Sequence, residues 1–164
     1  MIEMLGQLEP RHEFKDVILF EEQDEVNEVI FFNNGTYEVG FEINRTKEMV
    51  LRYKNCNLIG AYGVTFNKRS HFVYKTFTDC EGFFIRRAAW KGLIDNNPEV
   101  SCHLVAQVKE EYDRTTMNKV MHAKQHRLIK WNKRADYDSI TKTISIDPKF
   151  IPENYTAFGL KQDE

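Results

Sequence analysis

The sequence predicts an α+β fold in which short antiparallel strands come first and a separate set of helices follows. Segments rich in Val, Ile, Phe and Tyr recur about every 8–12 residues between residues 16 and 87, which is typical of a β-sandwich or barrel. After Arg87 the apolar residues change to helical spacing. Strands followed by segregated helices indicate an α+β domain rather than a parallel α/β fold.

The strand region is expected to begin after a short helix and to contain two tight turns. Ile2, Leu5 and Leu8 recur at intervals of three residues, which favours a short helix before Pro10. Gly35 suits a tight turn because glycine accepts a positive φ, and residues 43–46 resemble a hairpin turn. The expected strands are 16–22, 27–35, 36–43, 47–54, 57–60, 71–78 and 82–87.

Two helices are expected after the strands. Residues 88–97 form the first, and the second begins at Asn97-Pro98-Glu99, since Asn is a favoured N-cap and Pro and Glu suit the first turn. The second helix extends toward residue 130, because no proline interrupts residues 99–147. We therefore assign residues 1–130 to one domain with its closing helices and residues 131–164 to a C-terminal extension. One apolar helix face contains Val100, Leu104, Val108 and Tyr112.

Composition favours a single globular domain with a core. Apolar residues make up 41% of the 164 residues and charged residues 29%. No stretch is apolar enough for a membrane span, and the N-terminal residues do not resemble a signal peptide, so we expect a cytoplasmic location. Cys56, Cys80 and Cys102 form no CxxC pair, and we interpret them as reduced, buried thiols.

The order of elements and several local sequences resemble the cyclic-nucleotide-binding domain over residues 5–130. "KDVILFEEQDEVNEVIFFNNGTYEVGF" resembles the first half of that family, and "GFFIRRAAW" resembles the strand that leads into its first closing helix. "NLIGAYGVTFNKRS" falls at the phosphate-binding cassette. The resemblance implies a jelly-roll-like antiparallel β-roll, preceded by a short helix and closed by two C-terminal helices. It is greatest to the cytosolic domains of cation channels related to voltage-gated potassium and cyclic-nucleotide-gated channels.

The resemblance implies a ligand pocket lined by Gly60, Ala61, Tyr62, Arg69 and Ser70, with the long helix as its lid. In the family, a glutamate follows the cassette glycine and binds the ribose, and an arginine ten residues after the glycine binds the phosphate. Here Ala61 follows Gly60, and Arg69 lies nine residues after it, with Ser70 in the arginine's place.

The effect of the missing glutamate on ligand affinity can be calculated. A hydrogen bond to a charged group contributes about 1.5–3 kcal/mol, so its loss reduces affinity roughly ten- to a hundredfold. We therefore expect a degenerate pocket without a cofactor. Cyclic AMP or cyclic GMP would be the ligand if the site were intact.

The function that the resemblance implies is a regulatory or assembly module of a cation channel, at the cytosolic face of a membrane, in contact with other channel domains or subunits. Two alternatives stay open: a free-standing scaffold that uses the fold for protein contacts, and a true cyclic-nucleotide sensor with altered contacts. We expect no catalytic activity, since neighbours such as Ser70 and His71 point to opposite faces of a strand. We expect no metal site, because His122 and His126 lack a third ligand.

Charge is concentrated in one segment. Residues 114–134 hold seven basic and no acidic side chains, whereas residues 1–113 hold 13 basic and 19 acidic ones. A basic amphipathic helix suits an acidic protein partner, calmodulin or anionic lipid, but a solvated helix beside the acidic β-roll is the favoured interpretation. Nucleic acid is not expected, because the strands carry no matching basic face. The candidate contact residues are Lys119, Lys124, Arg127, Lys130, Lys133 and Arg134.

Overall fold

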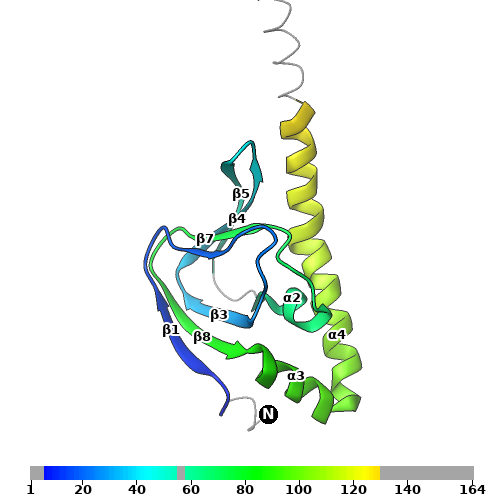
Figure 1. Ribbon diagram of the computed structural model, residues 1–164. Coiled ribbons are helices and arrows are strands. Elements are labelled where there is room, and N and C mark those ends of the chain that lie inside the picture. The colour runs from blue at the N-terminus through cyan, green and yellow to red at the C-terminus, as the bar shows by residue number, and fades with distance from the viewer. Residues whose placement is uncertain (1–5, 55–57, 130–164) are drawn as a thin grey trace, which may run out of the picture. The chain divides into compact units, whose positions relative to one another are not determined.

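The structure, a computed structural model, describes residues 6–54 and 58–129. The chain divides into two compact units, Met1–Ala123 and Lys124–Glu164. In the first unit, eight strands form two antiparallel four-stranded sheets that are followed by helices (Figure 1), which confirms the predicted α+β class. In the second unit, residues 124–129 are helical. No helix within the described ranges is long and apolar enough to cross a bilayer.

The two sheets enclose the core of the first unit. One sheet has the strand order β1-β8-β3-β6 and the other β2-β7-β4-β5. Alternate strand residues point inward and meet in the core, as the sequence pattern predicts; fully buried examples are Phe32, Phe41, Val39 and Ile85. The strands are β1 (Glu9–Glu13), β2 (Ile18–Phe20), β3 (Glu28–Asn34), β4 (Thr36–Ile43), β5 (Thr46–Lys54), β6 (Leu58–Ile59), β7 (Val73–Thr76) and β8 (Cys80–Arg86).

The N-terminal segment differs from the sequence prediction. Gly6 and Gln7 form a turn, and Pro10 lies inside β1. Proline is tolerated here because β1 is at the edge of its sheet and pairs only with β8 among the described strands. The remainder of the predicted helix, residues 1–5, lies outside the described residues.

Both predicted turns are present, but they connect the strands differently. Gly35 has a φ of 105° and joins β3 to β4, which belong to different sheets, so the chain passes from one sheet to the other here rather than forming a hairpin. Asn44 and Arg45 have φ values of 50° and 63° and join the paired strands β4 and β5. Two successive residues with positive φ are typical of a tight hairpin turn.

Three α-helices pack together beside the sheets (Figure 1). They are α2 (Ala61–Phe66), α3 (Arg87–Asn96) and α4 (Pro98–Tyr112). Pro98 occupies the predicted first position of α4. Asn97 makes no side-chain cap for α4; its Nδ2 instead donates to the carbonyl of Leu93, 2.9 Å away, and so completes the end of α3.

The long helix contains one wider turn. The π-helical segment η1 (Asp113–Met117) follows α4 directly, and the backbone N–H of Asn118 donates to the carbonyl of Asp113, five residues earlier. The Tyr53 hydroxyl, in β5, donates to the carbonyl of Thr115. Helical residues continue after η1, so the predicted long helix is present with this interruption.

The cysteines differ in their surroundings. Cys80 is buried, and its thiol lies 3.3 Å from the carbonyl of Thr78. Cys102 is exposed on α4, so the expectation of a buried thiol is wrong at this position. Cys56 lies outside the described residues.

Candidate functional site

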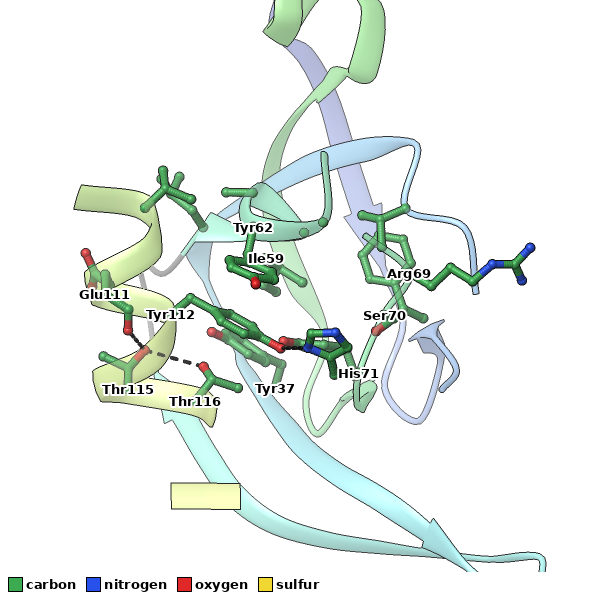
Figure 2. A pocket seen from close by; sticks show the side chains of 18 of the residues that line it. Tyr37, Ile59, Tyr62, Arg69, Ser70, His71, Glu111, Tyr112, Thr115 and Thr116 are labelled. Atoms are coloured by element: carbon green, nitrogen blue, oxygen red, sulfur yellow. Dashed lines mark hydrogen bonds between the residues drawn. The ribbon is translucent and has the colours of Figure 1, made fainter. Parts of the chain in front are cut away.

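A cavity of about 140 Å³ lies where α2 and α4 meet the sheets (Figure 2). All five residues that the resemblance assigned to the pocket line it: Gly60, Ala61, Tyr62, Arg69 and Ser70. The long helix supplies one wall, as expected for a lid, through Leu104, Gln107, Val108, Glu111, Tyr112, Thr115 and Thr116. The other lining residues are Phe20, Val26, Tyr37, Leu58, Ile59, Gly63, His71 and Tyr74.

Gly60 turns the chain from β6 into α2. Its φ is 83°, and a Cβ at this position would lie only 2.5 Å from the carbonyl oxygen of Glu28, so glycine is the residue that fits. Ala61 begins α2 and is 3% exposed. The first turn of α2 carries no acidic side chain. The cassette position therefore offers no carboxylate to a sugar hydroxyl.

Tyr62 of α2 and Tyr112 of α4 stack against each other. Their ring centroids are 4.1 Å apart and their planes differ by 9°. The hydroxyl oxygen of Tyr112 lies 3.1 Å from Nδ1 of His71 (Figure 2). Burial raises the pKa of the Tyr112 phenol, so it stays protonated at neutral pH. These contacts join the cassette helix to the long helix.

Arg69 and Ser70 make contacts that do not serve a phosphate. The Arg69 side chain extends away from Tyr62 and Tyr112 (Figure 2), and its Nη1 donates to the carbonyl of Gln23 at 2.9 Å. Ser70 is buried, and its Oγ donates to the carbonyl of Phe72 at 2.7 Å. The Ser70 hydroxyl is thus bonded to backbone rather than to the neighbouring His71.

Helix α2 is also tied to α3. The indole N–H of Trp90 donates to Oγ1 of Thr65 at 2.9 Å. Nη2 of Arg87 donates to Oδ1 of Asn67 at 2.7 Å, and Nζ of Lys91 donates to the same oxygen. Asn67 ends α2 in the left-handed region, with a φ of 53°. The cassette helix therefore contacts both closing helices through specific side chains.

Sequence reasoning did not single out Tyr112 or His71 as site residues. The four-residue apolar period did place Tyr112 on the inner face of the long helix, which was the available signal. His71 carries no local pattern that indicates its partner. The pairing of His71 with Tyr112 is visible only in the folded structure, where α4 lies beside the connection between β6 and β7.

The structure places only part of the predicted basic contact surface. Lys119 and Arg127 are exposed, and Lys124 is partly exposed. Lys130, Lys133 and Arg134 lie outside the described residues. Within the described ranges, no group of three or more His, Cys, Asp or Glu side chains could hold a metal ion.

The fold of the two sheets and their closing helices is like that of cyclic-nucleotide-binding domains. No protein-family model matches the sequence, and no curated protein matches it, but solved structures do. A transcriptional regulator from Thermotoga maritima matches with a TM-score of 0.57 and 16% identity, over 71% of this chain and 92% of that chain. The C-linker/CNBHD of zELK channels, crystallized in the presence of cAMP, matches with a TM-score of 0.57 and 15% identity, over 66% of this chain and 54% of that chain.

A third structure extends the comparison. The regulatory domain of Toxoplasma gondii PKA with cAMP matches with a TM-score of 0.51 and 11% identity, over 56% of this chain. The chain spans only 36% of the length of that PKA chain. Identities this low show the fold alone, and they support the predicted resemblance at that level.

Proposed function

We propose that this chain is a regulatory or assembly module of a cation channel that acts without a bound cyclic nucleotide. The observation that carries the proposal is the Tyr62–Tyr112 stack, which joins the cassette helix directly to the long helix. In this arrangement a contact within the protein connects the two elements that border the pocket. No ligand is needed to bridge them.

The chemistry of the cavity supports the same conclusion. Its volume of about 140 Å³ is below the roughly 300–1,000 Å³ of most ligand sites. The Arg69 side chain, the one arginine or lysine among the described residues that line the cavity, extends outward and bonds to the carbonyl of Gln23. Burying a phosphate without a cation or a set of donors is strongly unfavourable. A cyclic nucleotide would have to enlarge the cavity and reorient Arg69.

The regulatory part of the proposal rests on how α2 is held. Tyr62 contacts α4, while Thr65 and Asn67 accept hydrogen bonds from α3. A displacement of either closing helix would therefore shift α2. A displacement of α2 would likewise shift the closing helices. The likeness in fold to the C-linker/CNBHD of zELK channels and the sequence resemblance favour a channel as the protein that uses this coupling.

Calorimetric titration with cyclic AMP and cyclic GMP tests whether the module acts without nucleotide. We expect no saturable heat at ligand concentrations up to about 1 mM, which corresponds to a binding free energy weaker than about −4 kcal/mol. Submicromolar binding of either nucleotide would overturn the proposal and favour the altered sensor.

Sequencing of the transcript tests the channel part. A reading frame that continues upstream through several apolar membrane spans is expected for a channel. A transcript that begins at Met1 would contradict it and favour the free-standing scaffold.

A further inference from the structure

We propose that the cavity between α2 and α4 binds a small uncharged aromatic molecule of one or two fused rings. This inference rests on the proposed function, because it assigns a ligand class to the pocket that the proposal leaves without a nucleotide. The size of the cavity, its aromatic wall and the state of its polar groups carry the inference, and each excludes a different class of ligand.

The size excludes large ligands. The cavity has a volume of about 140 Å³. An engineered protein cavity of about 150 Å³ binds benzene. A single ring or a fused pair therefore fits with small side-chain movements, whereas a nucleotide with base, sugar and phosphate does not.

The wall of the cavity favours an aromatic ring. Tyr37, Tyr74 and Phe20 are 3%, 8% and 6% exposed, and Tyr62 and Tyr112 lie parallel beside them. Aromatic rings attract one another in offset and edge-to-face arrangements beyond the burial of their area. A flat ligand that enters beside the stacked tyrosines would make such contacts on several sides.

The polar groups of the cavity disfavour a charged ligand. The hydroxyl of Ser70 donates to Phe72, that of Thr115 donates to Glu111, and that of Tyr112 pairs with His71. In the part of the chain that the structure describes, no buried side-chain nitrogen or oxygen lacks a hydrogen-bond partner. The charged side chains of the lining, Arg69 and Glu111, are exposed to solvent. A charged ligand inside the cavity would therefore have to draw one of them inward or break one of these bonds to be solvated, whereas an uncharged ring would not.

Methyl-labelled NMR of the 164-residue chain, titrated with indole, tests the inference. We expect saturable shifts at the methyl groups of Leu104 and Val108, intermolecular Overhauser effects from indole to the same methyl groups, and a Kd below about 1 mM. Indole-3-acetate and tryptamine, which add a negative and a positive charge, should bind at least about tenfold more weakly.

Two variants locate the site. Leu104→Trp fills the cavity and should weaken indole binding at least about tenfold, because it occupies the space that the ligand needs. Leu93→Trp is the matched control, since Leu93 is also partly buried, lies on α3 and does not line the cavity. Indole should bind this control as it binds the native chain.

The outcomes separate the inference from the proposed function. An absence of saturable indole shifts, or Overhauser effects to residues away from the cavity, would overturn the inference. Because the Overhauser effects come from the native chain, they decide the matter even if Leu104→Trp fails to fold. Titration of the same sample with cyclic AMP and cyclic GMP tests the proposed function independently, so either can fail alone.

Discussion

The ring of Tyr112 lies parallel to that of Tyr62, with 4.1 Å between their centroids, although the two residues are 50 positions apart in the sequence. This is the direct aromatic contact between the cassette helix and the long helix. The stack joins two helices that are far apart in the sequence. Its energy can be measured as the coupling between substitutions of the two tyrosines.

A double-mutant cycle with Tyr62→Ala and Tyr112→Ala should give a coupling of about 0.5–1.5 kcal/mol, which is typical of aromatic pairs. Tyr112→Phe should cost less than Tyr112→Ala, about 0.5–1.5 kcal/mol, since it keeps the stack and loses only the bond to His71. Chemical denaturation of the four proteins measures the cycle. Strictly additive effects would show that the stack contributes no stability of its own.

Trp90→Phe should weaken the link between α3 and α2. The substitution removes the indole N–H that donates to Thr65 and leaves a small gap in the core, where Trp90 is 2% exposed. We expect a loss of about 1–3 kcal/mol in the free energy of unfolding. Thr65→Val removes only the acceptor and should cost about 0.5–1.5 kcal/mol. If Trp90→Phe and Thr65→Val lost the same free energy of unfolding, the packing of the Trp90 ring would contribute nothing beyond the hydrogen bond.

Tyr53→Phe should loosen the π-helical turn η1. Its hydroxyl donates to the carbonyl of Thr115, so the variant should lose about 0.5–1.5 kcal/mol. Hydrogen exchange of the Asn118 amide, which closes the wide turn on Asp113, should become faster in this variant. Unchanged exchange at Asn118 would mean that the turn is held by other contacts.

The pair of Glu9 and Arg86 should make stability depend on pH. The hydrogen bond from Arg86, with distances of 2.6 and 3.1 Å to the two carboxylate oxygens, lowers the pKa of Glu9 from its usual 4.5. A lowered pKa in the folded state means that the contribution is present above pH 4.5 and is lost as the pH falls below it. The Tm difference between the native chain and Glu9→Gln should therefore shrink on acidification. A difference that stays constant with pH would contradict this assignment.

The basic segment can be tested as a membrane contact. If residues 114–134 bind anionic lipid, the chain should sediment with anionic vesicles at low salt, and the triple variant Lys130/Lys133/Arg134→Gln should not. High salt should release the native chain, because exposed charges are screened over about 8 Å at physiological ionic strength. Vesicles without anionic lipid are the control. Equal sedimentation of the native chain and the variant would exclude the membrane contact.

Local patterns predicted those elements whose shape depends on their own residues. Alternation of apolar and polar side chains placed β4 at Thr36–Ile43, and the Asn97-Pro98 signal placed the start of α4. β1 was missed because Pro10 normally ends regular structure, and only the position of β1 at the sheet edge makes it acceptable. Sequence patterns do not reveal such an edge position directly.

The candidate site was predicted by position but not by orientation. Gly60 was assigned to the site because residues 57–70 resemble the phosphate-binding cassette, and the structure shows why glycine fits there, since a Cβ would collide with the carbonyl of Glu28. The direction of Arg69 depends on the carbonyl of Gln23, which lies 46 positions earlier in the chain and has no marker in the sequence. Long side chains on the rim of a pocket follow such distant partners, so their placement requires the assembled fold.

The wide turn at Asp113–Met117 changes the phase of the helix that follows it. Val108 and Val120 are both buried although twelve residues separate them. Twelve residues make about 3.3 turns of an α-helix, which would put the two side chains on different faces. If the π-helical turn absorbs one residue, the remaining eleven make about 3.1 turns, and both valines share a face. Deleting a single residue from this segment should therefore remove the wide turn, leave the two valines eleven positions apart on a regular α-helix and keep Val120 in the core.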